Sequence, residues 1–173
     1  MEILLEVKKG SIESLSIRKG ILDFEEKLKT IPGAMTGDCF PLKHTFVPGM
    51  YIREITMPAG SLLTSKIHKI EHPYFILRGD VSVLTEKGIV RLKTGFSGIT
   101  PAGTKRLLYC HEETVWVTVH RTDNTDLKLI EEEVIAKNFD ELYNVIEVTD
   151  FVKELNNAES NHVSEVAVQE SIM

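Results

Sequence analysis

Short runs of alternating apolar and polar residues fill the middle of the chain. The clearest are VSVLTE at 81–86, IVRLKT at 89–94 and TVWVTVHRT at 114–122. A period of two is typical of a β-strand with one face toward a core, and the Pro48-Gly49 and Lys87-Gly88 pairs mark turns between strands. The pattern therefore predicts an antiparallel β-barrel from about residue 50 to residue 120.

The last of these runs has two faces of different character. Val115, Val117 and Val119 share one face, and a face of three valines is expected to point into the core. Trp116 and His120 lie on the other face, so we expect them at the mouth of the barrel or on a partner surface.

A helical pattern precedes the strands. Residues 21–31 carry apolar side chains with the spacing of a short amphipathic helix, which Pro32-Gly33 would end. The first 20 residues alternate weakly and contain Gly10 and Gly20, so we expect a short strand or an arm there.

Beyond Asp123 the pattern becomes helical again, although residues 126–135 also fit a last edge strand. A further short helix is predicted over 148–155, and a flexible polar tail follows from residue 156. These patterns divide the chain into an N-terminal arm and short helix (1–32), a β-barrel (33–137), and a C-terminal helix and flexible tail (138–173).

Composition narrows the class of protein. The 173 residues carry a net charge of −6, which argues against a primary nucleic-acid-binding role. No apolar run approaches the roughly 18 residues that span a membrane, and the N-terminus lacks the pattern of a signal peptide. Two cysteines, Cys39 and Cys110, give no disulfide framework. We therefore expect a cytosolic protein without nucleic-acid or membrane partners.

Two spaced motifs organise the middle of the chain. The first comprises Gly60, Lys66, His68, His72 and Gly79, and the second comprises Gly95, Pro101, Gly103, Arg106 and Cys110. In spacing they resemble the two motifs of the cupin superfamily, G-x5-H-x-H-x3,4-E-x6-G and G-x5-P-x-G-x2-H-x3-N. The resemblance implies a mainly all-β fold, a cupin-like antiparallel jelly-roll β-barrel with short flanking helices at both ends.

The resemblance also implies four metal-ligand positions, and here the residue types depart from it. Those positions are Lys66, His68, His72 and Arg106. Two permanent cations would repel a divalent ion, since unit charges about 4 Å apart interact by about 4 kcal/mol at an effective dielectric of 20. The standard four-ligand site is therefore not expected.

Three alternatives follow from this departure. The barrel is purely structural, or the four residues converge and bind a small anion, or a metal site has shifted. In a shifted site His68 and His72 would be ligands, with His120 or His44 as the third. No cofactor is expected in the first two cases, whereas a divalent metal ion is required in the third.

A second resemblance rests on the phrases PLKHTFVPGMYIRE, KIHKIEHP, PAGTKR and TVWVTVH. They are similar to an uncharacterised group of cupin-like proteins carried by tailed bacteriophages, over roughly residues 32–142. This resemblance implies a non-enzymatic phage protein in the host cytoplasm or the virion, a virion or assembly component that acts through protein–protein contacts. Because a barrel of this kind exposes sheet edges, we also expect a homo-oligomer.

Overall fold

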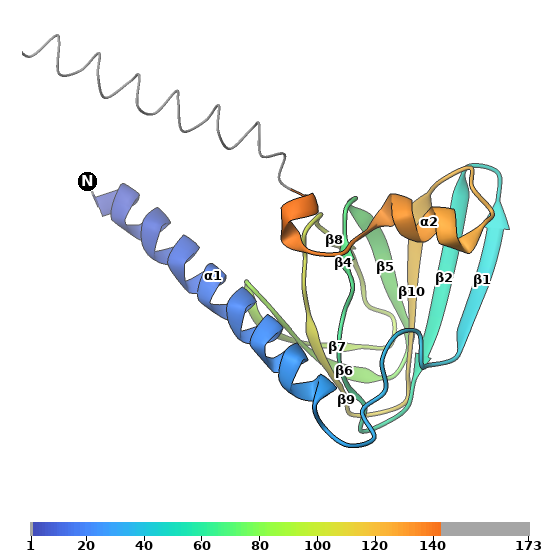
Figure 1. Ribbon diagram of the computed structural model, residues 1–173, viewed down its shortest axis with the longest axis horizontal. Helices are drawn as coiled ribbons and strands as arrows, with labels where there is room; N and C mark the ends of the chain where they lie inside the picture. Colours follow the sequence, from blue (N-terminus) through green and yellow to red (C-terminus); the bar gives the residue numbers. More distant parts are fainter. Residues whose placement is uncertain (1, 143–173) are drawn as a thin grey trace, which may run out of the picture. The chain divides into compact units, whose positions relative to one another are not determined.

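The computed structural model describes the backbone of residues 2–142 and the side chains of residues 15–142. Within this range the chain is mainly β, and every strand pair is antiparallel. Figure 1 shows the strands gathered into one barrel-like body, with the helix α2 across one end of it.

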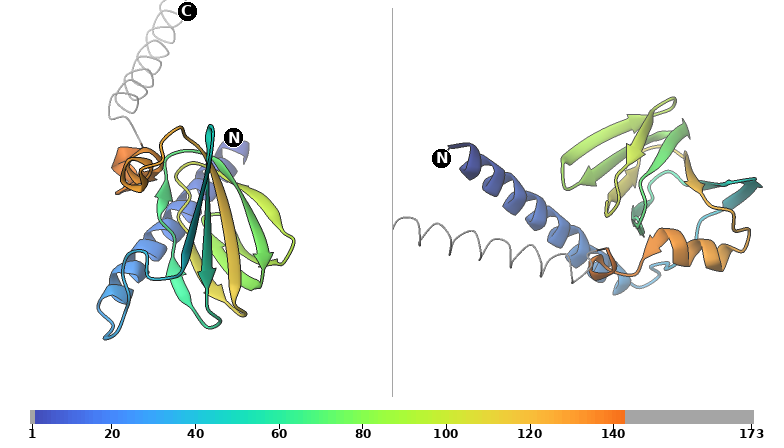
Figure 2. Two further views of the ribbon diagram at one scale, coloured as in Figure 1. Left: turned by 90° about the vertical axis from the view of Figure 1, so that its right-hand side faces the viewer. Right: turned by 90° about the horizontal axis from the view of Figure 1, so that it is seen from above.

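The larger sheet has five strands in the order β1-β2-β10-β5-β8. Their bounds are Leu42–Val47 (β1), Met50–Met57 (β2), Thr114–Arg121 (β10), His72–Arg78 (β5) and Ser97–Thr100 (β8). The facing sheet has four strands in the order β3-β9-β6-β7, with bounds Leu62–Thr64, Leu107–Cys110, Asp80–Thr85 and Gly88–Lys93. Figure 2 shows the strands from two further sides. The predicted fold class, an antiparallel jelly-roll β-barrel, is confirmed.

At two turns of this fold the backbone conformation requires a glycine. Gly49 closes the β1–β2 hairpin with a φ of 77°, in the left-handed region that other residues rarely adopt. Gly79 joins β5 to β6 with a φ of 108°, and a Cβ there would lie 2.6 Å from the Cα of Thr114. The glycine lets the two sheets meet at this corner.

Apolar side chains from both sheets fill one end of the barrel. The main cluster consists of Met57, Tyr74, Ile76, Val81, Val83, Leu92, Leu108, Cys110 and Trp116. Trp116 belongs to this cluster, so the inner face of β10 is the one with Trp116, Thr118 and His120. The prediction that the three valines face the core was therefore wrong. They lie on the opposite face, where Val117 is still only 8% exposed, because the inner face of this strand carries Thr118 and His120 toward the other end of the barrel.

The helices differ in part from the prediction. Helix α1 covers Glu2–Lys29, so the first 20 residues are helical and the predicted strand or arm there is wrong. Gly10 and Gly20 each lower the stability of the helix by about 1 kcal/mol relative to alanine. The lysines, glutamates and leucines around them are good helix formers. Ile21 of this helix is 1% exposed, so the helix is anchored to the barrel within the predicted 21–31 segment.

The sequence left residues 126–135 open between a helix and a last edge strand, and most of them are helical. Residues Leu127–Val134 form helix α2, and only Ile135–Ala136 form a strand, β11. This strand pairs with β4 (Ile67–His68), so the segment after α2 is hydrogen-bonded to the strand that carries His68. Asp126 caps α2 by accepting a hydrogen bond from the backbone N–H of Lys128.

The remaining described residues form a separate unit that begins at Lys137 and contains a short 3-10 helix, Phe139–Glu141. The predicted helix at 148–155 and the predicted tail lie outside the described residues. Among the described residues, no helix is long and apolar enough to cross a membrane.

Candidate metal centre

The interior of the larger sheet changes from apolar to polar along its strands. In the register of β2 with β10, Ile55 pairs with Trp116, Arg53 with Thr118, and Tyr51 with His120. In the register of β5 with β10, Ile76 pairs with Trp116 and Tyr74 with Thr118. The polar residues therefore lie together at one end of the barrel, where α2 packs against Tyr51 through Ile130 and Val134.

A bend between two short strands brings the motif-one histidines together. Strand β4 ends at His68 and β5 begins at His72, with a turn between them. Alternate residues from 66 to 72 do not share one face, since Ile70 is 47% exposed whereas Ile67 is buried. The bend allows the rings of His68 and His72 to lie with centroids 4.2 Å apart.

His120 completes a group of three imidazoles. Its ring centroid lies 4.4 Å from that of His72 and 5.3 Å from that of His68. One ring nitrogen from each of the three histidines lies within 4.8 Å of those of the other two. His72 and His120 are 2% and 4% exposed, and they come from two neighbouring strands of one sheet. We call these three residues the histidine triad.

The environment keeps the triad neutral. Burial, followed by the charges of His72 and His120, lowers the pKa of His68 to about 2. Burial also lowers the pKa of His120 to about 4 and lowers that of His72. Neutral imidazole is the form in which histidine binds a metal ion.

Two nitrogens of the triad are buried without a hydrogen-bond partner, His68 Nδ1 and His72 Nε2. His72 Nδ1 lies 3.1 Å from the carbonyl oxygen of Ile70. Because a carbonyl only accepts, Nδ1 carries the proton, and Nε2 then presents a lone pair to the interior. A backbone carbonyl that orients a histidine in this way is the usual support for a metal ligand.

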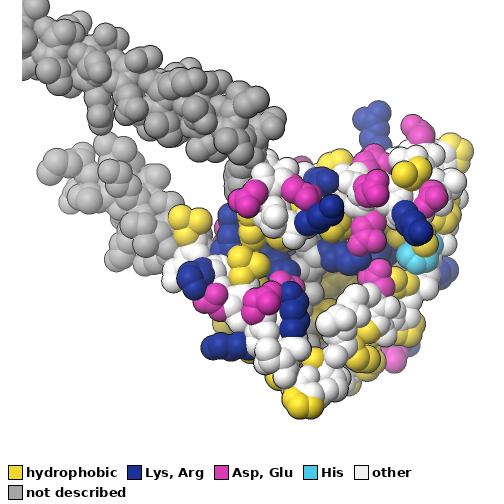
Figure 3. Space-filling view, viewed as in Figure 1, with side chains coloured by type: hydrophobic (Ala, Val, Ile, Leu, Met, Phe, Trp, Pro, Cys, Tyr) yellow, Lys and Arg dark blue, Asp and Glu magenta, His cyan; other side chains and the backbone are white. Residues whose placement is uncertain are grey.

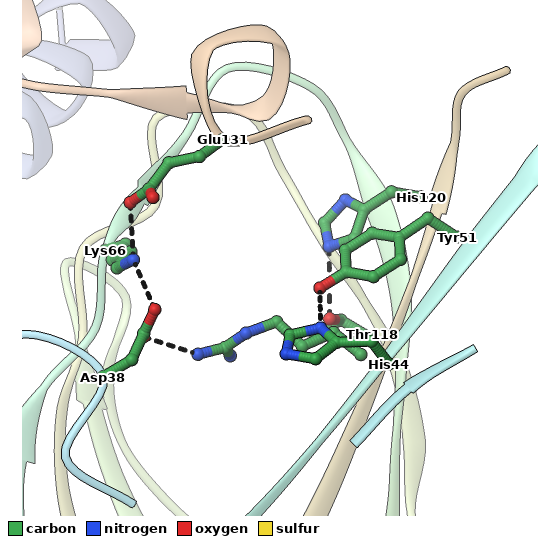
Figure 4. Close-up of polar contacts among 8 residues, drawn as sticks. Asp38, His44, Tyr51, Lys66, Thr118, His120 and Glu131 are labelled. Carbon is green, nitrogen blue, oxygen red and sulfur yellow. Dashed lines mark hydrogen bonds and ion pairs between the residues drawn. The ribbon is translucent and has the colours of Figure 1, made fainter. Parts of the chain in front are cut away.

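Lys66 does not join the triad. Its amine lies 2.6 Å from a carboxylate oxygen of Glu131 and 3.3 Å from one of Asp38, so its charge is paired. Figure 4 shows Lys66 between these two carboxylates, with His120 and Tyr51 across the site. The predicted convergence of Lys66 with the other three residues therefore does not occur, because Lys66 lies in the break between β3 and β4 and the two acidic side chains hold its amine.

Arg106 does enter the barrel, and it is 6% exposed. Its Nη2 donates to the hydroxyl of Thr100 at 2.7 Å. The guanidinium carbon lies 5.3 Å from the ring centroid of Tyr74 and 5.6 Å from that of Trp116, within cation–π range. Thr100 is the cross-strand partner of His72, so Arg106 lies next to the triad along the sheet.

His44, the alternative third ligand, is placed differently. Its Nδ1 lies 2.7 Å from the hydroxyl of Tyr51, and its ring stacks on the Tyr51 ring. Tyr51 in turn stacks against His120 at 6.0 Å, which leaves His44 outside the triad. The Tyr51–His44 pair can pass a proton between phenol and imidazole beside the triad.

Three residues that shape this site were not singled out from the sequence: Tyr51, Thr100 and Tyr74. The first lies in the alternating run after Pro48-Gly49, at the position that pairs with His120 once the register is known. Tyr74 follows His72 by two residues, so strand parity alone places both on one face. Thr100 carries no signal of its own, because its role depends on the β5–β8 register.

The residues present fit a divalent transition metal ion. Three neutral imidazoles suit zinc, copper, iron or nickel, and three protein ligands leave positions open for a substrate. His68 Nδ1 and His72 Nε2 are buried without a hydrogen-bond partner, so both are available as ligand atoms. Figure 3 shows that the molecule is hollowed on the face drawn there, with acidic and basic side chains around the hollow.

No protein family and no curated protein matches the sequence. Among solved structures, the chain is similar to a cupin-2 domain containing protein from Shewanella frigidimarina, with 8% identity, 47% of this chain and 80% of that chain covered, and a TM-score of 0.41.

It is also similar to KdgF from Halomonas sp., with 14% identity, 54% of this chain and 87% of that chain covered, and a TM-score of 0.45. The DMSP lyase DddQ from Ruegeria pomeroyi DSS-3 is a third similar structure, with 22% identity, 56% of each chain covered and a TM-score of 0.44.

Proposed function

We propose that the barrel binds a divalent transition metal ion through His68, His72 and His120 and acts as a metal-dependent enzyme on a small molecule. The observation that carries this proposal is the convergence of three buried imidazoles, two of them with unpartnered nitrogens. The third ligand comes from β10 and replaces the motif-two position, where Arg106 stands.

A purely structural barrel explains these residues poorly. A buried polar atom without a hydrogen bond costs about 1–3 kcal/mol, and the triad holds two such atoms. The other end of the same barrel is filled by apolar side chains, which avoid this cost. A metal ion would satisfy the unpartnered nitrogens and offset their burial.

The protein side chains have separate roles in this proposal. The triad holds the ion, and the carbonyl of Ile70 fixes the tautomer of His72. A bound divalent ion supplies Lewis-acid polarisation of a substrate oxygen. The Tyr51–His44 pair, at 2.7 Å, is suited to donate or accept a proton beside it.

The sequence-based hypothesis of a non-enzymatic bacteriophage virion or assembly component finds no support in the comparisons or the site. A protein that acts only through surface contacts does not need a triad of buried histidines. Self-association, virion partners and the cellular location stay predictions.

Elemental analysis of the purified full chain tests the proposal. After dialysis against zinc or iron and removal of free ion, we expect about one ion per chain. His72→Ala and His120→Ala should each abolish stoichiometric binding, whereas His111→Ala, which removes an exposed histidine bonded to Ser82, should retain it. Absence of metal from the folded unaltered chain would exclude the proposed function.

A further inference from the structure

We propose, on the basis of this function, that Arg106 binds a carboxylate of the substrate, so that the enzyme acts on a small organic acid. The guanidinium lies inside the barrel next to the triad. The acid would place its carboxylate on Arg106 and a second oxygen toward the ion held by the histidines.

The first step is that the charge of Arg106 is uncompensated. Only two Lys or Arg side chains among the described residues are buried, Lys105 and Arg106. Lys105 forms an ion pair with Glu25 at 2.7 Å. Within residues 15–142 no carboxylate pairs with Arg106: burial lowers its pKa, and the only group that opposes this is Tyr74. A buried cation without an anion is costly, so an external anion would stabilise it.

The second step is that the guanidinium is held but not saturated. Thr100 accepts from Nη2, and the guanidinium carbon lies 5.3 Å from the ring centroid of Tyr74 and 5.6 Å from that of Trp116. An arginine has five N–H donors, and the described residues accept from one of them. The remaining donors form the planar fork that matches a carboxylate.

The third step is that Gly98 allows Tyr74 to reach Arg106. Gly98 pairs with Tyr74 across β5 and β8, and a Cβ at Gly98 would lie 2.9 Å from the Tyr74 ring. The glycine therefore lets the ring lie where it contacts Arg106. Because Thr100 pairs with His72 in the same ladder, the cation and the triad face one interior.

The fourth step is that a carboxylate fits this site better than a phosphate. A divalent ion and one guanidinium together would give three positive charges beside neutral imidazoles and aromatic rings. A single guanidinium, which lies beside the stacked rings of Tyr74 and Trp116, fits a planar carboxylate better than a tetrahedral phosphate, which usually engages several cations or a row of backbone N–H groups.

The test is calorimetric titration of the zinc-loaded full chain. The probes are glycolate, its neutral analogue glycolamide, and inorganic phosphate. We expect glycolate to bind, and glycolamide and phosphate to bind at least tenfold more weakly. Arg106→Gln should weaken glycolate binding by roughly 10- to 100-fold, the range for a hydrogen bond to a charged group, with the zinc content unchanged.

Two further variants keep the result interpretable. Arg91→Gln removes an exposed arginine that pairs with Asp80 outside the barrel, and it should leave glycolate affinity unchanged. Thr100→Val removes the hydroxyl that positions the guanidinium, so it should weaken glycolate binding even if Arg106→Gln does not fold.

The outcomes separate the two proposals. Unchanged glycolate affinity in zinc-loaded Arg106→Gln and Thr100→Val, or no glycolate binding to the unaltered chain, would overturn the role of Arg106. Stronger binding of phosphate than of glycolate would overturn the choice of a carboxylate. If the unaltered chain holds no zinc, the metal function fails by itself, and titration of that chain decides the anion site: binding lost in Arg106→Gln supports it, and no binding overturns it.

Discussion

Removing the metal should make the stability of the protein steeply dependent on pH below about 6.5. In the folded metal-free chain, burial lowers the pKa of His120 to about 4 and that of His68 to about 2, and it also lowers the pKa of His72. In the unfolded chain each imidazole takes up a proton near its ordinary pKa of about 6.5. The contribution of these groups is therefore fully present above pH 6.5 and is lost as the pH falls toward the folded-state values.

The size of the effect follows from proton linkage. Each histidine that is protonated only on unfolding lowers the free energy of unfolding by about 1.4 kcal/mol per pH unit. The full shift of His120 to about 4 corresponds to about 3 kcal/mol, and His120 and His68 together steepen the dependence to about 3 kcal/mol per pH unit. The lowered pKa of His72 acts in the same direction. Since domains unfold with about 5–15 kcal/mol, a fall from pH 6.5 to pH 5 should remove a substantial part of the stability of the metal-free protein.

Urea denaturation in the presence of a chelator at pH 7.5, 6.5, 6.0 and 5.5 measures this dependence. His120→Gln should reduce the slope by about 1.4 kcal/mol per pH unit, because it removes one proton that is taken up on unfolding. His111→Gln alters an exposed histidine and should leave the slope unchanged. A metal-free protein whose unfolding free energy is constant from pH 7.5 to 5.5 would refute the assignment of the triad as buried and neutral.

Three other predictions follow from single contacts. Gly98→Ala should destabilise the protein by about 1–3 kcal/mol in thermal unfolding, because the new Cβ would overlap the Tyr74 ring, and a cost below 0.5 kcal/mol would contradict the close packing there. Lys66→Ala should leave the metal content unchanged and lower the free energy of unfolding by less than about 1 kcal/mol, since the ion pairs of Lys66 with Asp38 and Glu131 are partly exposed. Tighter metal binding in this variant would show that the lysine opposes the ion after all. Light scattering should give a mass of at least two 19.5 kDa chains, because Phe75, Leu77 and Ile99 expose apolar surface on the larger sheet, and a monomer at micromolar concentration would contradict self-association.

The sequence was sufficient for the barrel and for two of the three histidines. Turn residues and a period of two identify strands independently of their partners, so the β1–β2 and β6–β7 hairpins were predicted at their places. His68 and His72 were found by spacing, and His120 was named only as one candidate beside His44. The register of β10 with β5 and β2, which decides between the two, depends on contacts far apart in the sequence.

Two predictions about which side chains face the interior were wrong. Hydrophobicity identifies the inner face of a strand only where the interior is apolar, and the inner face of β10 carries Thr118 and His120 beside the triad. The valine face of that strand lies on the outside of the sheet, next to Phe75 of β5. The prediction for Lys66 failed for another reason: motif spacing assigned it to the site, but it lies in the break between β3 and β4, where Asp38 and Glu131 hold its amine.

The most direct test of the metal centre is a crystal of the full chain soaked with cobalt or zinc, with diffraction data collected at the absorption edge of the metal. We predict one anomalous peak about 2.0–2.2 Å from a nitrogen of each of His68, His72 and His120. A map without a peak at the triad, or with peaks only at exposed carboxylates or at His44, would contradict the account.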